Sequence, residues 1–150
     1  VSAESLARTF GDARIRGGAR AAAARVEEAI GKIATYSIAA RARSATIAAR
    51  GDDHRDGGAC LKTLGAYVGN LLDHPDEEKF RSINGANAAF LTKVGNLDGG
   101  VAVLAAVGFA RGPETHLVMS ADALAANRKL LVATRKRLAQ ALEAFLVANA

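Results

Sequence analysis

The sequence predicts an α+β domain that is mostly α-helical. Half of the 150 residues are hydrophobic, alanine is abundant and only 5% are aromatic, which favours a core of closely approaching helices. Apolar residues recur at helical spacing along most of the chain, and one short run at residues 115–119 suits a strand. We therefore expect a small antiparallel β patch at about residues 109–119 and a long C-terminal helix.

Residues 1–57 are expected to form a helical extension and a linker. For residues 1–18, which several glycines interrupt, a short docking helix and a loose tail both remain open. Residues 19–49 are rich in Ala and Arg and contain no Pro, which favours one long helix. Its larger apolar side chains share one face, which should pack against the domain or another chain. These residues are Val26, Ile30, Ile33 and Ala40.

Residues 51–58 are polar, charged and bounded by glycines, a composition typical of a linker. We place the boundary there, so that residues 58–150 form the second unit. Its first helix, at about residues 59–72, should end before Pro75. The apolar residues that it presents to the core are Leu61, Leu64, Val68, Leu71 and Leu72.

Three short helices are expected next. The first begins at Pro75, where a missing N–H costs nothing, and acidic residues follow it at the positive end of the helix dipole. Asn87 is a good N-cap for the second helix, and Asp98 for the third. The third helix should end at Gly108 in the left-handed conformation, with Phe109 folded back on its last turn. The apolar residues of the last two helices are Phe90, Val94, Val101, Leu104 and Val107.

The last helix should run from about residue 121 to residue 148, with Ser120 as its cap. Large apolar residues recur on it every seven positions. A coiled coil would also need apolar residues at the intervening positions, which carry Asn127, Thr134 and Ala141, so the amphipathic helix of a globular domain is the better interpretation. The residues of the repeat are Leu124, Leu131, Leu138 and Phe145, with Leu142 and Leu146 filling the face.

The sequence contains few of the residue patterns that catalysis would need. The three histidines lie far apart and have no Cys or carboxylate at metal-ligand spacing. Glu77 and Glu78 are adjacent, so on a helix they point in different directions and cannot act as one acid–base pair. The glycine-rich residues 95–100 lack the Lys-Ser/Thr ending of a P-loop. We expect no catalytic residue, no metal and no cofactor in this chain.

A single cysteine, Cys60, excludes an internal disulfide framework and is compatible with a reducing compartment. Its position in a helical apolar pattern predicts a buried core thiol. No run of eighteen apolar residues and no signal-peptide pattern is present, so no membrane segment is expected. The chain begins at Val1 rather than Met, and we expect it to be a fragment of a larger protein.

The net charge of +5 and the pI near 9.8 raise the question of nucleic-acid binding. The excess is spread thinly over both halves, so a mildly basic solvated surface is the better interpretation and no nucleic-acid partner is expected. A basic helical nucleic-acid-binding domain stays open as an alternative, as does a homo-oligomerisation module built on the first and last long helices. The basic residues of the first alternative are Arg41, Arg43, Arg128, Lys129, Arg135, Lys136 and Arg137.

Polar and aromatic residues lie near the ends of the short helices and would converge if these helices pack together. Asn70, Lys79, Phe80, Asn87 and Phe109 would supply aromatic faces, one cation and two amides, which are the parts of a short-peptide site. From the residues alone, the aromatic side chains fit a core equally well and Asn87 fits a simple cap.

A series of short motifs in this part of the chain resembles the PUB (or PUG) domain, most closely that of cytoplasmic peptide:N-glycanase. The resemblance covers about residues 59–146 in unbroken order. The motifs are Tyr67-Val68-Gly69-Asn70, Pro75, Glu78-Lys79-Phe80-Arg81-Ser82-Ile83, Asn87-Ala88-Ala89-Phe90, Gly99-Gly100-Val101, Val107-Gly108-Phe109 and Glu114-Thr115-His116-Leu117-Val118.

The resemblance implies a monomeric, non-catalytic module that binds a short acidic-aromatic peptide. The ligand is most often the extreme C-terminal tail of the AAA ATPase valosin-containing protein, in ubiquitin-dependent quality control and endoplasmic-reticulum-associated degradation, which places the protein in the cytoplasm and also in the nucleus. Lys79 would attract an acidic residue, the two amides would hold the peptide backbone or terminus, and the aromatic residues would pack its Leu and Tyr. The residues at the family's peptide pocket are Asn70, Lys79, Phe80, Asn87, Gly108 and Phe109.

The chain departs from the family's pattern at four positions. Phe80 replaces the usual Tyr, and the lost hydroxyl would cost a ligand hydrogen bond, about 0.5–1.5 kcal/mol. Asn84 and Asp98 stand where peptide:N-glycanases commonly carry Arg, which makes the pocket rim less basic, and Asn96 replaces a common Pro.

Overall fold

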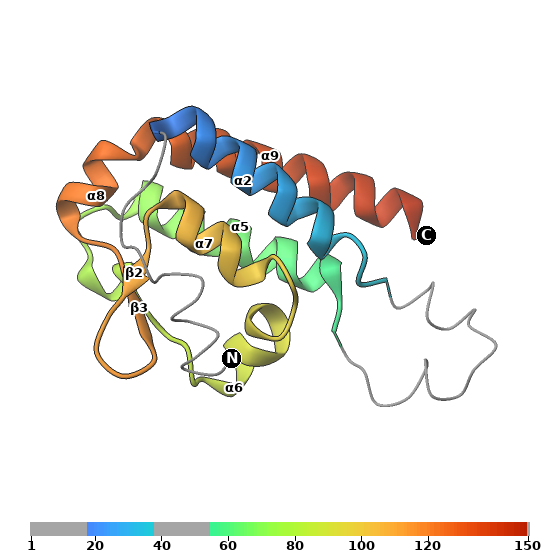
Figure 1. The fold of residues 1–150 in the computed structure, drawn as a ribbon, viewed down its shortest axis with the longest axis horizontal. Coiled ribbons are helices and arrows are strands. Elements are labelled where there is room, and N and C mark those ends of the chain that lie inside the picture. Colours follow the sequence, from blue (N-terminus) through green and yellow to red (C-terminus); the bar gives the residue numbers. More distant parts are fainter. Residues whose placement is uncertain (1–17, 38–54, 150) are drawn as a thin grey trace.

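The computed structural model describes residues 18–37 and 55–149, and Figure 1 shows how their helices and strands are arranged. The expectations for residues 1–17, for residues 38–49 and for His54 lie outside these ranges. The mostly α-helical α+β class, with a small sheet and a long C-terminal helix, is confirmed. The elements in chain order are α2 (Gly18–Ile33), α5 (Gly57–Asp73), the 3₁₀-helix η1 (Glu78–Arg81), β1 (Ser82–Asn84), α6 (Ala88–Phe90), the π-helical turn η2 (Leu91–Gly95), α7 (Gly100–Val107), β2 (Ala110–Arg111), β3 (His116–Val118), α8 (Ala121–Ala126) and α9 (Arg128–Ala148).

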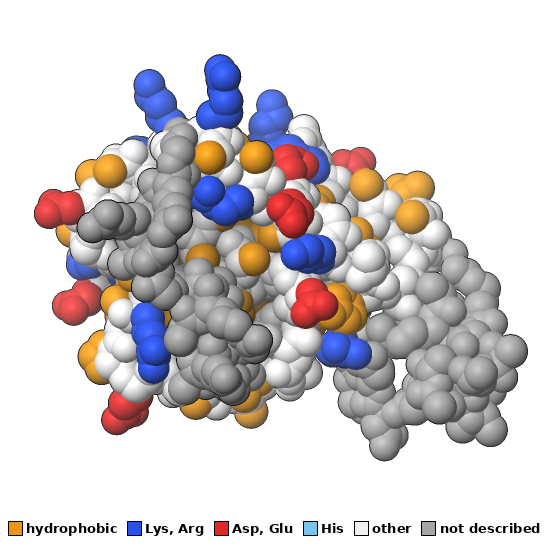
Figure 2. Space-filling view, viewed as in Figure 1, with side chains coloured by type: hydrophobic (Ala, Val, Ile, Leu, Met, Phe, Trp, Pro, Cys, Tyr) orange, Lys and Arg blue, Asp and Glu red, His pale blue; other side chains and the backbone are white. Residues whose placement is uncertain are grey.

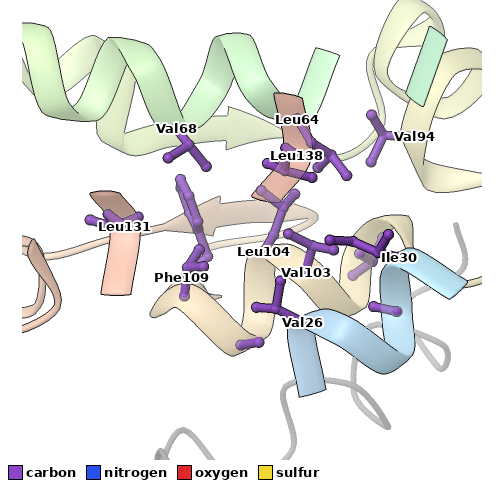
Figure 3. Packing of buried hydrophobic residues seen from close by; sticks show 14 of the residues in the cluster. Val26, Ile30, Leu64, Val68, Val94, Val103, Leu104, Phe109, Leu131 and Leu138 are labelled. Carbon is purple, nitrogen blue, oxygen red and sulfur yellow. The ribbon is translucent and has the colours of Figure 1, made fainter. Parts of the chain in front are cut away.

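The core forms where α5 packs along α9. All five apolar residues predicted for the inner face of α5 are buried, and so are the four residues of the seven-residue repeat on α8 and α9. Figure 3 shows Leu64 and Leu138 pointing toward one another, with Leu104 of α7 close by. Leu146 is 58% exposed, so the prediction that it fills this face is wrong. It follows the repeat by one position, which turns it away from α5.

Helix α2 belongs to this same core. Its predicted stripe of Val26, Ile30 and Ile33 is buried, and Figure 1 shows α2 crossing above α7 beside α9. Glu27 accepts two hydrogen bonds from the guanidinium of Arg137, which lower the pKa of Glu27 and hold α2 to α9. The division of the chain at residues 57 and 58 stays a prediction.

The long helix expected at residues 19–49 ends at Ile33, so that expectation is wrong for residues 34–37, the part beyond the helix that the structure describes. The last turn tightens, since Tyr36 donates its backbone N–H to the carbonyl of Ile33 at 3.1 Å, and the Thr35 hydroxyl donates to the carbonyl of Lys32 at 2.7 Å. Tyr36 then leaves the helix direction, and its hydroxyl accepts a hydrogen bond from the backbone N–H of Asp98 at 3.0 Å. Tertiary contacts of Tyr36 therefore override the propensity of the Ala-rich sequence.

Helix α5 begins two residues earlier than expected, at Gly57, within the segment predicted as a linker. Asp56 caps it, with its carboxylate accepting from the backbone N–H of Gly58 at 3.0 Å. The N–H of Gly57 donates to the carbonyl of Tyr36 at 2.8 Å, which joins the start of α5 to the end of α2.

The sheet has three antiparallel strands in the order β1-β3-β2. The hairpin of β2 and β3 lies within the β patch expected at residues 109–119. Strand β1, at residues 82–84, was not expected, because the residues after Pro75 were predicted to form a short α-helix. Of these residues, only the four of η1 are helical. Ile83 of β1 is buried opposite Leu117 of β3, and this pairing outweighs the local helical signal.

Helix α7 is preceded by Gly99, not by the predicted cap Asp98. Gly99 has φ of +95°, and a Cβ there would lie 2.4 Å from the carbonyl oxygen of Ala29 on α2. The end of α7 is as predicted, because Gly108 has φ of +118° and the N–H of Phe109 donates to the carbonyl of Leu104 at 3.0 Å. This is a Schellman motif.

The last helix is broken at Asn127 into α8 and α9, which corrects the expectation of one helix. The predicted cap Ser120 is confirmed, since its hydroxyl accepts from the N–H of Ala123 at 3.0 Å. The Asn127 side chain lies against Gly108, where a Cβ would approach its Nδ2 to 2.6 Å. The break lets α8 turn while Leu124 and Leu131 both remain in the core.

We expect Gly99→Ala to lower the free energy of unfolding by about 1–3 kcal/mol, because Ala in the left-handed region is strained and its Cβ would push α2 away from α7. Urea titration followed by circular dichroism measures this. Gly31→Ala is the matched control. Gly31 is a helical position of α2 with nothing within 4 Å of a Cβ, so the substitution should stabilise by about 0.5–1 kcal/mol. Equal stability of Gly99→Ala and the wild type would contradict the close approach of α2.

Candidate functional site

A hollow of about 360 Å³ opens between the end of α5, η1, β1 and the start of α6. Four of the six residues predicted for the site line it together: Asn70, Lys79, Phe80 and Asn87. Their role in binding stays a prediction, but the structure brings them to one place from three separate elements. The full set of lining residues is Tyr67, Asn70, Lys79, Phe80, Ser82, Ile83, Asn84, Asn87 and Phe90.

Gly108 and Phe109 are not among the residues that line the hollow. Phe109 is only 3% exposed, and Figure 3 shows it pointing toward Val68 of α5 within the core. Gly108 faces Asn127. The structure therefore gives this pair a packing role at the end of α7.

Five lining residues were not among the six predicted site residues, although one of them, Asn84, was expected at the pocket rim. Tyr67 and Phe90 replace Phe109 as aromatic walls, with ring centroids 6.5 Å apart. Ser82, Ile83 and Asn84 come from β1, whose position as a strand was not expected. Tyr67 lies one helical turn before Asn70, so this spacing was the available signal for its place beside that amide.

Two of the three amides that line the hollow use their side-chain oxygen to accept hydrogen bonds from the backbone. The Asn87 side-chain oxygen accepts from the N–H groups of Ala89 and Phe90 at 2.9 and 3.2 Å, which confirms it as the cap of α6. The Asn84 side-chain oxygen accepts from the N–H of Ala86 at 3.0 Å. Since both oxygens are used by the backbone, the NH₂ groups are what these amides have left for a ligand. They would bind hydrogen-bond acceptors such as carbonyl or carboxylate oxygens.

Phe80 forms the aromatic part of the rim. Its ring centroid lies 5.2 Å from that of His74, and the ammonium nitrogen of Lys79 lies 5.1 Å from the Phe80 centroid. An ammonium group at this distance interacts favourably with the face of the ring. Phe80 and Lys79 therefore present an apolar surface and a positive charge side by side.

Lys79 also has an acidic neighbour. Its ammonium nitrogen lies 3.4 Å from one carboxylate oxygen of Glu77, and the other oxygen of Glu77 lies 3.7 Å from Nδ1 of His74. All three side chains are substantially exposed, so solvent weakens the attraction between Lys79 and Glu77. A stronger carboxylate ligand could therefore replace Glu77 beside Lys79.

The polar groups of the hollow can donate and accept hydrogen bonds. Its polar groups are an ammonium, amides, a serine hydroxyl and the Tyr67 hydroxyl. Burial, with a smaller contribution from Cys60, raises the pKa of Tyr67, so its hydroxyl stays protonated and able to donate. The lining residues include no His, Cys, Asp or Glu to act as nucleophile or general base.

Over the described ranges, no group of three or more His, Cys, Asp or Glu side chains could hold a metal ion. Within these ranges, too, no single helix is long and apolar enough to span a membrane. The α6–η2 segment and α7 reach the necessary length and composition only together, with a bend of 92° between them.

The model of the PUB domain family matches residues 56–144 of this chain. UBX domain-containing protein 6 of Caenorhabditis elegans is 43% identical over 54 residues, which cover 36% of this chain and 12% of the relative. Peptide-N(4)-(N-acetyl-beta-glucosaminyl)asparagine amidase of Rattus norvegicus is 38% identical over 79 residues, 50% of this chain and 12% of the relative. The human amidase is 44% identical over 57 residues, 38% of this chain and 9% of the relative. The chain thus corresponds to about an eighth or less of these relatives.

Cys60, which lies in the first turn of α5, should be inert in the native protein. It is fully buried, and burial, with a smaller contribution from Asp56, raises the pKa of its thiol from 9.0 to about 12. At pH 8 we expect a disulfide reagent such as DTNB to modify it only as fast as the protein unfolds. The urea-unfolded protein, which should release one equivalent of the thiolate product at once, is the control. Immediate reaction of the native protein would show that the thiol is accessible.

Proposed function

Because this chain belongs to the PUB domain family, we propose that it is a non-catalytic docking module that binds a short acidic-aromatic peptide in the hollow beside α5. PUB domains are protein-interaction modules. The hollow is large enough for a few side chains and too small for a folded domain.

The convergence of hydrogen-bond donors with aromatic walls is the observation that carries this proposal. Asn84 and Asn87 have only their NH₂ groups left to offer, and Lys79 adds a positive charge at the rim. An acidic peptide supplies the matching acceptors, namely side-chain carboxylates, backbone carbonyls and a terminal carboxylate. Its aromatic side chain would pack between Phe80 and Phe90.

The proposed partner is the C-terminal tail of the AAA ATPase valosin-containing protein, or a similar acidic-aromatic motif. The support is the family resemblance together with the donor-rich hollow. In this role the module would dock a larger protein onto the ATPase during ubiquitin-dependent quality control, in the cytoplasm and nucleus. A short peptide buries little surface and loses entropy on ordering, so we expect micromolar affinity, about −7 to −8 kcal/mol.

Two differences from the family's pattern lie at this hollow. Phe80 and Asn84 both line it, so the missing Tyr hydroxyl and the missing Arg charge would bear directly on the ligand. Asp98, the other position where Arg is common, lies beside Tyr36 and is not a lining residue. The ligand of this chain should therefore depend more on amide hydrogen bonds and less on charge than that of a peptide:N-glycanase.

The alternative functions gain no specific support from the described residues. Figure 2 shows several Lys and Arg side chains together along the upper edge of the molecule, and Asp and Glu among the Lys and Arg lower down. Arg135 and Arg137 lie in ion pairs with Asp73 and Glu27. Helices α2 and α9, the elements of a self-association module, direct most of their large apolar residues into the shared core, although Val132, Leu146 and Val147 of α9 are exposed. Arg41 and Arg43 lie outside the described residues.

We expect the wild type to bind a synthetic acidic-aromatic C-terminal peptide with micromolar Kd in calorimetric titration, and Lys79→Glu to abolish detectable binding. Asn87→Asp is the sharper variant. A carboxylate still accepts from the N–H groups of Ala89 and Phe90, so the cap remains, but the NH₂ donor is lost and a repelling charge is added. Asn87→Ala would not separate the capping role from the binding role, because loss of the cap alone lowers the stability of the protein by about 0.5–2 kcal/mol.

Lys93→Glu, which makes the same charge change on an exposed residue that does not line the hollow, is the matched control and should bind within about twofold of the wild type. Phosphorylating the peptide's Tyr should also remove binding, since a dianion would then meet the apolar walls. Unchanged affinity in both Lys79→Glu and Asn87→Asp would exclude the hollow as the binding site.

Glu77→Gln should tighten peptide binding by about two- to fivefold at low salt, because Lys79 would no longer share its charge with a neighbouring carboxylate. The same titration at high salt should show a smaller gain. Glu28→Gln is the control, since Glu28 lies in a similar exposed ion pair with Lys32 on α2, with the charged atoms 3.6 Å apart. Weaker binding by Glu77→Gln would mean that Glu77 supports the ligand instead of competing with it.

A further inference from the structure

A second groove, of about 460 Å³, adjoins the hollow. Ser82 of β1 lines both, so the two openings meet at this residue. The surface of the second groove is mostly apolar. Its lining residues are Glu78, Arg81, Ser82, Pro113, His116, Val118, Met119 and Ser120.

Arg81 gives this groove its positive charge. One terminal nitrogen of its guanidinium, Nη1, donates to the carbonyl of Met119 at 3.2 Å. Its Nε is buried without a hydrogen-bond partner, and it is the one such side-chain nitrogen or oxygen among the described residues. A guanidinium that is partly withdrawn from water and incompletely bonded favours a nearby anion, because the anion offsets the cost of its desolvation.

Ser82, the residue that lines both openings, lies on β1. On either side of Ser82, backbone hydrogen bonds run to the segment that contains β3. The carbonyl of Arg81 accepts from the N–H of Met119 at 2.8 Å, and the N–H of Gly85 donates to the carbonyl of Thr115 at 3.1 Å. In an antiparallel pair the bonding residues alternate, so the N–H and C=O of Ser82 point away from β3. Strand β1 is at the edge of the sheet, and an extended peptide that crosses it could bond these groups.

We propose that the second groove is a subsite for acidic residues that precede the aromatic anchor of the bound peptide, which crosses β1 at Ser82 to reach it. This inference rests on the proposed function, because it takes the hollow as the site of the anchor. Arg81 would attract the upstream carboxylates, and Glu78 on the groove would oppose them. The groove would thereby select tails that carry acidic residues before the anchor.

The test compares two synthetic peptides by calorimetric titration: a short one that contains only the anchor end, and one extended at its N-terminus by acidic residues. Glu78→Lys removes the opposing charge without touching the hydrogen bond of Arg81. It should strengthen binding of the extended peptide by about three- to tenfold and leave the short peptide within twofold. Glu143→Lys, the same change on the exposed surface of α9, should show no such difference between the peptides.

A direct variant is Arg81→Lys, which keeps the charge but loses the planar guanidinium. It should reduce the advantage of the extended peptide in the wild type. The inference is overturned if the wild type binds both peptides equally, or if Glu78→Lys strengthens both to the same extent, and in either case the proposed function stands. If the wild type binds neither peptide, the proposed function fails and the subsite with it.

Discussion

The packing of α5 against α9 is the constraint on which the rest of the structure depends. Leu64 and Val68 face the core, and this fixes the rotation of α5 about its axis. Tyr67 and Asn70 must then lie on the side of α5 where η1, β1 and α6 gather. The packing of α5 against α9 thus positions one wall of the hollow. Tyr67 and Asn70 are held in that wall by the helix to which they belong.

The other walls are held by local hydrogen bonds and by the small sheet. Asn87 fixes the start of α6, and the pairing of Ile83 with Leu117 fixes β1. The cap of α6 and the strand β1 are both short, and each is anchored by a buried side chain. Phe90 anchors the cap, and Ile83 anchors the strand. The walls of the hollow are therefore anchored by buried side chains, although much of its rim is exposed.

Local signals in the sequence predict much of this fold, because their physics is local. Ser120, Asn87 and Gly108 act where they were expected, since a cap or a left-handed glycine needs only its nearest neighbours. Residues 82–84 could not be assigned in the same way, because a partner strand more than thirty residues away decides their conformation. The break at Asn127 likewise follows from its contact with Gly108.

The candidate site was predictable to a similar degree. Asn70, Lys79, Phe80 and Asn87 converge, and they lie close together in sequence. Phe109 was placed with them because aromatic residues suit both a ligand surface and a core, and sequence alone does not separate these roles. Its burial follows from the Schellman turn, which carries the side chain back over α7.

The side-chain oxygens of Asn84 and Asn87 accept hydrogen bonds from the backbone, and this limits which compounds could compete with the natural ligand. Neither Asn84 nor Asn87 can rotate to offer an acceptor without breaking a turn or a cap. Amine-bearing compounds, peptide N-termini and Lys-rich tails would meet these two donors with donors and gain neither hydrogen bond. Screening for inhibitors of this module should therefore begin with carboxylates and their isosteres that carry a planar aromatic group.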